Sequence, residues 1–393
     1  MDFHNTIDYG VCMGKIEYRH YQKGDEEQLA DLFNRAFQMN GGGFVRTPKI
    51  WKWRYVQSPG FEPEQCQLAE DRDTGKIVGA IYVNLVERIP LGNQRVLVGD
   101  INDVSCHPDY TGQGIATELM KMAIKFMKNK GCDISMLTAD YNGFPRKNTY
   151  LKYGYKDIDR QIVFINFPQP LNLIKNLIGF SILFPVLFIL SFIPRLISRL
   201  RVKLNHSTKN LSYKIAHNQD HSEYREAVNR IMPLNYEGFP KYDNEKFKWA
   251  RLKAPLKQHI PSYIFIKMGN KIIGGASLTH QNLYSFRFGV KMRIGILHEL
   301  FLNQRFFPTK KDLYLGYVYL VDKVMKAATK RNIGGFFLMI DSQNLSLQKA
   351  LRTMGFLKFK GGAVMVKSFN KKLDLTKIKK PIFVPTYVST GIP

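Results

Sequence analysis

The feature that most constrains the fold is a glycine-containing loop between an expected strand and an expected helix. The apolar, alternating run at residues 96–104 predicts a strand. Residues 119–127 place apolar side chains three and four positions apart, which predicts an amphipathic helix. Gly112 and Gly114 stand between them and allow a tight turn that leaves backbone N–H groups free at the helix N-terminus. Because that end of a helix carries partial positive charge, the loop predicts a main-chain site for a phosphate-bearing ligand.

The loop resembles a known acyl-CoA signature. Residues 111–116 read Thr-Gly-Gln-Gly-Ile-Ala. This is similar to the Arg/Gln-x-x-Gly-x-Gly/Ala motif of the GCN5-related N-acetyltransferase (GNAT) superfamily, which also follows a strand. Thr111 stands where the family usually has Arg or Gln. The resemblance implies that loop amides bind the pyrophosphate, so Thr111 weakens the signature more than the binding. Taken alone, the glycine pair is equally compatible with a purely steric turn.

A second motif follows an expected strand at residues 133–138 and an expected short helix at 146–152. Residues 150–155 read Tyr-Leu-Lys-Tyr-Gly-Tyr and match the family's Tyr-x-Lys-x-Gly-Phe/Tyr landmark. In the family, the tyrosine four residues before that glycine often protonates the departing CoA thiolate, which implies Tyr150 as general acid. A phenol with a pKa of about 10 stays protonated at neutral pH and can donate. The alternative is that Tyr150 merely packs beneath the cofactor.

The resemblance also implies which positions contact the cofactor. The backbone of residues 104–106 would pair with the pantetheine amides like an added strand, and Asn142 would contact the pantetheine or the adenosine side. The implied cofactor-binding residues are Val104, Ser105, Cys106, Thr111, Gly112, Gln113, Gly114, Ile115, Ala116, Thr117 and Asn142. The general base stays open among Asp100, Asp103 and His107, and a water-mediated route needs no dedicated base.

Length, cysteine spacing and charge bound the class of protein. A chain of 393 residues favours two domains. Its cysteines, at positions 12, 66, 106 and 132, lack metal-ligand spacing, so reduced cytosolic thiols and no metal cofactor are expected. Residues 1–168 contain 21 basic and 21 acidic residues, so the net charge of +26 lies entirely in residues 169–393. Such asymmetry predicts an anionic partner, a membrane surface rather than nucleic acid, since no nucleic-acid motif is recognisable.

An uncharged apolar run separates the two halves. Residues 177–194 are 18 residues without charge, followed at once by four basic residues within 195–203. This length reaches the lower limit for a membrane-spanning helix, and the basic residues would face a cytoplasmic headgroup layer. Both halves are expected in the cytosol, and Pro185 interrupts the run, so a monotopic insertion is favoured. A genuine span and a buried inter-domain helix are the alternatives.

The second half resembles a degenerate copy of the first. Each half contains two expected helices, a hairpin, another helix and a strand. In the second half they are expected at residues 221–231, 244–253, 261–278, 313–330 and 336–340. The two motifs of the first half are missing there. Residues 303–311 contain no glycine loop, and Leu351 stands where Tyr150 stands in the first copy. This arrangement is similar to that of Eis-like acetyltransferases, although no sterol-carrier-like domain is expected after residue 369.

We therefore expect an α/β fold of two tandem GNAT domains, each a mixed twisted sheet flanked by helices. Residues 1–168 are the expected active, acyl-CoA-binding domain, and residues 169–206 form a hydrophobic, membrane-associating linker. Residues 207–369 are the degenerate domain. Residues 370–393 form a basic tail that contacts a membrane or is poorly ordered.

The expected reaction is direct transfer of an acetyl or other acyl group from acyl-CoA to an amine. The amine belongs to a small molecule, a lipid-linked compound or a protein, and the enzyme works in the cytoplasm, on the cytoplasmic face of a membrane. Two other classes compete with this interpretation. One is a non-catalytic acyl-CoA sensor or scaffold, and the other is a basic protein associated with nucleic acid.

Overall fold

The computed structural model describes residues 15–37, 42–92, 94–169, scattered positions between 186 and 202, and residues 206–217, 221–285, 290–378 and 381–383. The first half comprises β1 (Ile16–His20), α1 (Glu26–Phe37), β2 (Gly42–Phe44), α2 (Pro48–Arg54), β3 (Cys66–Asp71), β4 (Lys76–Leu91), β5 (Gln94–Cys106), α3 (Ile115–Asn129), β6 (Ile134–Asp140), the π-helical turn η3 (Arg146–Tyr150) and β7 (Lys156–Asn166). Short 3-10 turns η1 (Pro63–Gln65) and η2 (Pro108–Tyr110) precede β3 and α3.

The second half repeats this order. After α6 (His206–Lys209) it comprises β8 (Leu211–His217), α7 (His221–Asn235), α8 (Asn244–Leu252), η5 (Lys257–His259), β9 (Ser262–Met268), β10 (Lys271–Ser285), β11 (Val290–Leu302), η6 (Gln304–Phe306), α9 (Lys310–Lys330), β12 (Gly335–Asp341), α10 (Leu345–Thr353), β13 (Leu357–Ser368) and η7 (Leu375–Lys377). Two tandem copies of one α/β pattern, as predicted from the sequence, are thereby confirmed.

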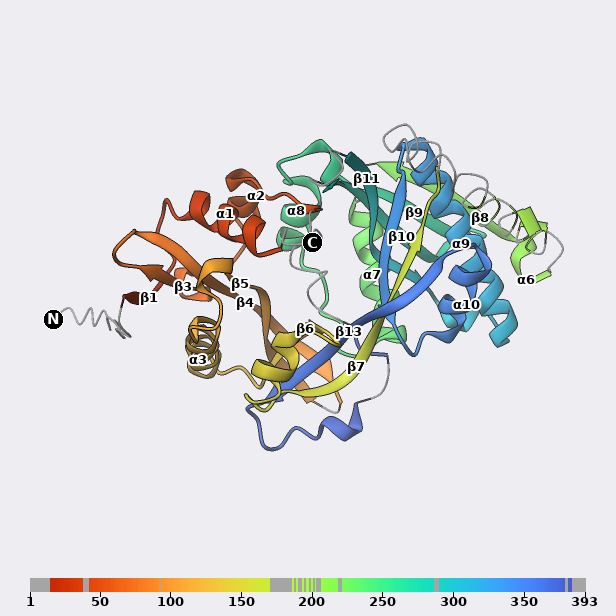
Figure 1. Cartoon of the computed structure of the whole chain (residues 1–393). Coiled ribbons are helices and arrows are strands. Elements are labelled where there is room, and N and C mark those ends of the chain that lie inside the picture. The colour runs from red at the N-terminus through yellow and green to blue at the C-terminus, as the bar shows by residue number, and fades with distance from the viewer. Residues whose placement is uncertain are drawn as a thin grey trace.

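The two halves share one sheet and exchange their last strands. The strand order is β1-β3-β4-β5-β6-β13-β7-β12-β11-β10-β9-β8, with β2 beside β10. Strand β13, at the end of the second half, lies between β6 and β7 of the first, and Val366 pairs with both Met136 and Lys156. Strand β7 in turn pairs with β12 of the second half. Figure 1 shows β7 and β13 crossing at the centre of the molecule.

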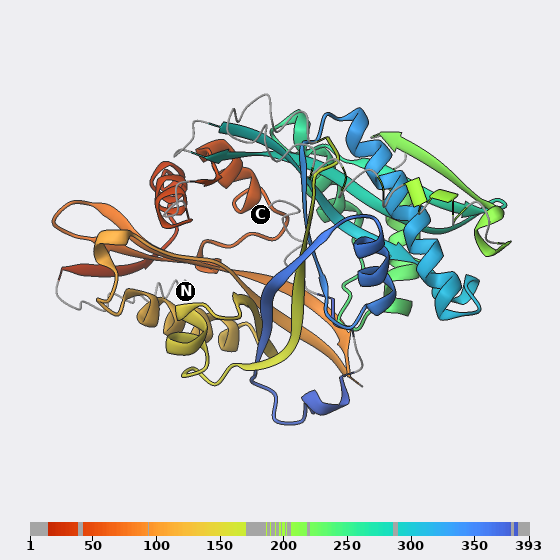
Figure 2. The ribbon, with the colours of Figure 1, turned by 45° about the vertical axis from the view of Figure 1, so that its right-hand side comes forward.

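This exchange bears on the expected domain boundaries. The expected domain boundaries at residues 168, 207 and 369 stay a prediction. In space, each half is completed by the final strand of the other, and Figure 2 shows these two long strands running between the halves. Neither half therefore has its complete sheet from its own segment alone.

In the first half the helices cover both faces of the sheet. Helix α3 covers one face, where a Cβ added to Gly99 of β5 would lie 2.2 Å from the Sδ atom of Met127. Helices α1 and α2 cover the other face, and there the rings of Tyr55 and Tyr82 lie 4.1 Å apart between centroids. Figure 1 shows α3 on the opposite side of β4 and β5 from α1 and α2. Successive side chains of a strand point to opposite faces of the sheet. The sheet of the first half therefore has an α3 face and an α1–α2 face.

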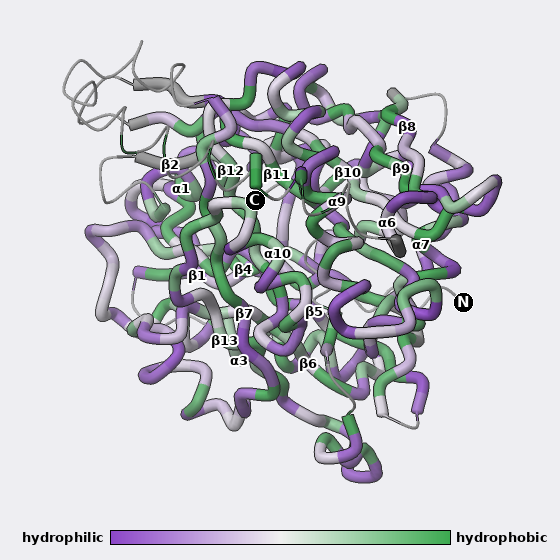
Figure 3. The backbone as a smooth tube through the Cα atoms, turned by 90° about the vertical axis from the view of Figure 1, so that its right-hand side faces the viewer, coloured by the Kyte–Doolittle hydropathy of each residue, from purple (hydrophilic) through white to green (hydrophobic). Residues whose placement is uncertain are grey.

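The second half is built in the same way. Helices α9 and α10 pack against one face of β9–β12 through the largest apolar cluster of the described residues, and α7 packs against the other face. Figure 3 shows apolar residues concentrated along the strands and hydrophilic residues along the peripheral loops. Burial of these apolar faces is the main stabilising contribution to such a layered fold.

The apolar run at 177–194 lies mostly outside the described residues. Of the described residues within and after it, six apolar ones are in helical conformation and about half exposed. They are Val186, Ile189, Ile193, Leu196, Ile197 and Leu200. No helix in the described part of the chain is both long and apolar enough to cross a membrane.

Part of the expected basic tail is packed against the fold. Leu373, Ile378 and Ile382 are buried in an apolar cluster with β4, β5 and β13. Ile382 also forms a parallel bridge with Glu237, just after α7. These apolar residues of the tail therefore contribute to the core, while residues 379–380 and 384–393 lie outside the described part.

Candidate active site

The candidate site lies where two parallel strands separate. Strands β5 and β6 pair only as far as Ile101 and Leu137, although both continue beyond these residues. On its other edge β5 stays paired with β4 as far as Cys106. Residues 104–106 therefore turn an edge with no described strand partner toward the opening. A ligand that contains amide groups can add to such an edge in the manner of a β-strand.

The glycine loop follows this edge and opens toward solvent. Gly112 and Gly114 have φ values of +83° and +81°, which favour glycine, and a Cβ added to either would meet nothing within 4 Å. Gly114 is the N-cap residue of α3 and provides no side chain for capping. The backbone N–H groups of residues 112–116 have no acceptor among the described residues. Consecutive N–H groups at a helix N-terminus suit an anion, so this geometry is compatible with the phosphate site, which stays a prediction.

Tyr150 lies beneath the point where the strands separate. It is 7% exposed and belongs to the apolar cluster that contains Ile101 and Leu137, the last paired residues of β5 and β6. Burial raises the pKa of Tyr150 to about 12, so the phenol stays protonated at neutral pH. Tyr155 packs edge-on against it, with ring centroids 6.2 Å apart. The position and protonation state both suit a proton donor.

The remaining predicted contact residues are divided between the loop and its surroundings. Ser105 is buried, whereas Thr111 and Gln113 are exposed at the loop. The Thr111 hydroxyl donates to the carbonyl of Pro108 at 2.9 Å, so its side chain supports the loop. Asn142 is exposed in the turn after β6, and its backbone N–H donates to Asp140. Which of these residues contacts a cofactor stays a prediction.

The structure separates the three candidates for the general base. Asp103 lies in a bulge of β5 at a φ of +50° and is ion-paired with the buried guanidinium groups of Arg46 and Arg54. Although burial opposes ionisation, the two guanidinium charges hold the pKa of Asp103 below its usual value. His107 is occupied as a cap, because its ring accepts the backbone N–H of Asp109. Neither residue is a suitable base.

Asp100 differs from both of them. Its side chain is completely buried, and burial raises its pKa to about 7 against the opposing effects of Asn102 and Arg54. The Asn102 amide donates to one carboxylate oxygen at 3.0 Å, and the other oxygen has no hydrogen-bond partner among the described residues. A carboxylate with a pKa near neutrality can accept a proton at physiological pH. Asp100 lies on β5 just before the bulge.

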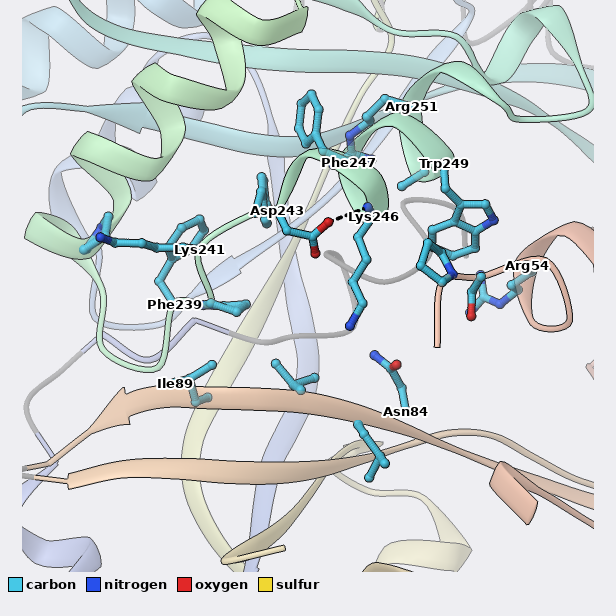
Figure 4. Close-up of a pocket in the computed structure, with 18 of the residues that line it drawn as sticks. Arg54, Asn84, Ile89, Phe239, Lys241, Asp243, Lys246, Phe247, Trp249 and Arg251 are labelled. Carbon is cyan, nitrogen blue, oxygen red and sulfur yellow. Dashed lines mark hydrogen bonds between the residues drawn. The ribbon is translucent and has the colours of Figure 1, made fainter. Parts of the chain in front are cut away.

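A pocket that the sequence did not reveal lies on the α1–α2 face, between the two halves. Its volume is about 310 Å³, and Figure 4 shows α8 above it and strand β4 below it. From the first half Arg54, Tyr82 and Asn84 line it, and from the second half Lys246 and Trp249. Since Tyr82 pairs with Asn102, and Asn84 with Asp100, the floor of this pocket adjoins the bulge of β5.

Two tryptophans join the halves at one end of this pocket. The indole N–H of Trp249 donates to the carbonyl of Trp53 at 2.9 Å, and that of Trp53 donates to the carbonyl of Trp249 at 3.3 Å. This reciprocal pair reflects an internal similarity of residues 51–59 and 247–255, which begin Trp-Lys-Trp and Phe-Lys-Trp and end in proline. The repeated triplet was the available sequence signal for this contact.

The second half lacks the features of a cofactor site but retains a buried ion pair. Helix α9 begins with a capping box, in which the Thr309 side chain accepts the backbone N–H of Asp312 and the Asp312 side chain accepts that of Thr309, and no glycine loop precedes it. Leu351 is fully buried where the first half has Tyr150. In the β11 bulge, Glu299 pairs with Arg251 at 2.6 Å, much as Asp103 pairs with Arg54. Within the described residues, no cluster of side chains could hold a metal ion.

A family model and two curated relatives match part of the chain. Residues 17–158 match the family model described as Acetyltransferase (GNAT) domain. The chain is 25% identical over 152 residues to the uncharacterized N-acetyltransferase YafP of Escherichia coli (strain K12), which is 38% of this chain and 88% of that protein. It is 23% identical over 156 residues to mycothiol acetyltransferase of Thermobifida fusca (strain YX), and this match spans about half (48%) of that relative.

Solved structures match nearly the whole chain at the level of fold. Saccharomyces cerevisiae N-myristoyltransferase with bound myristoyl-CoA has a TM-score of 0.68 at 14% identity, covering 91% of this chain and 80% of that one. A GCN5-related N-acetyltransferase from Anabaena variabilis has a TM-score of 0.55 at 14% identity, covering 90% and 72%. The fold of two halves is therefore shared with these proteins.

Proposed function

We propose that the chain transfers an acyl group from acyl-CoA directly to an amine, on the premise that residues 17–158, which match the Acetyltransferase (GNAT) domain model, form such a domain. Acyltransferase chemistry with an acyl-CoA co-substrate is the property common to this domain. The direct route, the amine acceptor and the roles of individual residues are our proposal. The observation that carries it is the alignment of three features along one path: the free N–H cradle, the open edge of β5 and buried Tyr150.

The residues of the chain would divide the work as follows. The N–H groups of residues 112–116 bind the diphosphate, and the edge at residues 104–106 orients the pantetheine. Asp100 accepts the proton lost by the amine, directly or through a water molecule, as the nitrogen–carbon bond forms. Tyr150 donates its proton to the sulfur as the carbon–sulfur bond breaks. Phosphate-bearing ligand and acceptor would approach from opposite faces of the sheet.

We also propose that the enzyme is cytoplasmic and peripheral on the cytoplasmic face of a membrane. The support is the half-exposed apolar set between residues 186 and 200, beside a second half that carries the whole net charge of +26. Apolar insertion together with basic charge favours binding to anionic lipid. Sedimentation with vesicles containing anionic phosphatidylserine tests this, and a chain that stays in the supernatant at low salt contradicts it.

Calorimetric titration with acetyl-CoA tests the acyltransferase proposal. The wild-type chain is expected to bind in the micromolar range, and the double variant Gly112→Asp/Gly114→Asp to lose binding, because two carboxylates would face the diphosphate and the backbone would be strained. The matched control is Gly60→Asp/Gly269→Asp, because both glycines also have a positive φ and open surroundings but lie outside the loop. If both double variants bind acetyl-CoA equally, the loop is not the diphosphate site.

Sensor function is the second candidate, favoured by one observation. Tyr150 makes no described side-chain hydrogen bond, so a role in packing alone is compatible with its position. A sensor would bind acetyl-CoA in the titration above but release no free thiol in the presence of any amine. Measurement of thiol release with a mixture of primary amines distinguishes the enzyme from the sensor.

A further inference from the structure

The pocket between the halves lies where an acceptor would meet the acyl group. Arg54 lines this pocket and also lies 3.4 Å from Asp103 in the β5 bulge. Tyr82 and Asn84 form part of its floor on β4, directly beside the β5 residues at which pairing with β6 stops. The pocket thus adjoins the part of β5 where pairing with β6 stops, on the α1–α2 face, opposite the face that is covered by α3.

The charge of the pocket lining is strongly positive. Arg95, Lys241 and Lys246 line it, and none of these three has an ion-pair partner among the described residues. The side chain of Lys246 is half-buried and extends from α8 across the cavity toward Asn84 (Figure 4). The single acidic lining residue, Asp243, is the N-cap of α8 and accepts the backbone N–H of Lys246 at 2.7 Å. Arg95 and Lys241 are exposed, whereas Lys246 is directed into the pocket, and a cation without an ion-pair partner in a partly closed pocket indicates an anionic ligand.

The rest of the lining is mostly apolar and rigid. Its apolar members are Pro59, Leu85, Val86, Ile89, Pro90, Pro233, Phe239, Pro240, Tyr242, Phe247, Trp249 and Ala250. Several are prolines or buried aromatic rings, which lose little conformational entropy when a ligand is bound. A ligand that complements this pocket therefore combines an apolar group with a separate acidic group.

We propose that the acceptor is a small amine that also carries an acidic group, a carboxylate or a phosphate, next to an apolar group. The inference rests on the proposed acyltransferase function and specifies its acceptor class. The acid is bound by Lys246 with the help of the Asn84 amide, and the apolar group packs against Phe239 and Trp249. The amine then points toward β5 near its bulge, where Asp100 is paired directly with Asn84.

Binding of matched probes to the full chain saturated with acetyl-CoA tests this inference without requiring turnover. The probes are 3-phenylpropionate, phenyl phosphate and 3-phenylpropanamide, the last having the same shape as the first but no charge. We expect one or both acids to bind at least roughly tenfold more tightly than the amide, because charge-assisted hydrogen bonds are stronger than neutral ones. The preferred acid identifies the acidic group as carboxylate or phosphate.

Two substitutions on α8 localise the effect. Lys246→Met removes the charge inside the pocket and is expected to abolish the preference for acid over amide. Lys248→Met removes an equal charge from an exposed position of the same helix outside the pocket, and is expected to retain it. The inference is overturned if the amide binds as well as the acids, if no probe binds, or if Lys246→Met keeps the preference. Failure of the chain to bind acetyl-CoA in the same titrations refutes the proposed acyltransferase function instead.

Discussion

Replacement of Asp100 by Asn is expected to stabilise the fold above pH 7 and to lower activity. The substitution keeps the shape of the side chain and an oxygen that can accept the hydrogen bond from Asn102. It removes a charge from a completely buried position. A catalytic group whose ionisation is costly in the folded state should combine these two effects, whereas a purely structural carboxylate should not.

The magnitude follows from the pKa of Asp100. Burial raises it from 3.8 to about 7, a shift of about 3 units, and each unit corresponds to about 1.4 kcal/mol. The folded state therefore binds the proton more tightly than the unfolded state, and stability falls as the pH rises from about 4 to about 7. Above pH 7 the full cost of roughly 4 kcal/mol is present. At pH 5.5 only about half of it has developed.

Urea unfolding of wild type and Asp100→Asn at pH 8 and pH 5.5 measures this difference. The stabilisation by Asn should be smaller at pH 5.5 by about 2 kcal/mol. Asp103→Asn is the matched control with the opposite sign, because it leaves two buried guanidinium groups without their partner and should destabilise the chain. In the wild type, kcat/KM for acyl transfer should rise about tenfold per pH unit up to about pH 7, and the variant should lose this limb. The reasoning is refuted if Asp100→Asn is the less stable protein at pH 8, or if its pH profile matches that of the wild type.

Three further predictions concern other parts of the chain. Tyr150→Phe should lower kcat by a factor of about 100 with little change in the binding of acetyl-CoA, measured by thiol release and calorimetry, since it removes only the donated proton. Glu299→Gln should lower the free energy of unfolding by about 3 kcal/mol, measured by urea denaturation, because Arg251 would remain buried without its anionic partner. Residues 1–168 expressed alone should be aggregated by light scattering, and residues 207–393 added by co-expression should restore a soluble complex, because β6 and β7 lack the strand between them.

Local sequence patterns predicted the elements of this chain well. The helix expected at residues 244–253 is α8 (Asn244–Leu252), and the hairpin expected at 261–278 is formed by β9 and β10. The glycine loop forms as expected, since a positive φ at residues 112 and 114 depends only on the local backbone. Such features are encoded within a few residues of the chain and need no information about tertiary contacts.

The features that sequence analysis did not find depend on contacts between distant segments. The exchange of β7 and β13 cannot be seen in the local sequence. The alternation of apolar and polar side chains along a strand is the same whichever strand it pairs with. The choice among Asp100, Asp103 and His107 required the positions of Arg46 and Arg54, which lie about fifty residues earlier. The inter-half pocket required both halves, and only the similarity between residues 51–59 and 247–255 could have indicated the contact at its end.

The exchanged strands explain how a half without a cofactor loop can still contribute to the site. Because β7 is paired with β12 and β13 with β6, the second half is attached to the first along the length of two strands. This attachment fixes α8 opposite β4, and the reciprocal Trp53–Trp249 hydrogen bonds hold it there. The buried Glu299–Arg251 pair joins β11 to α8, and loss of either partner would be costly. The second half therefore contributes a rigid helix, α8, as one side of the pocket, and this helix carries Lys246.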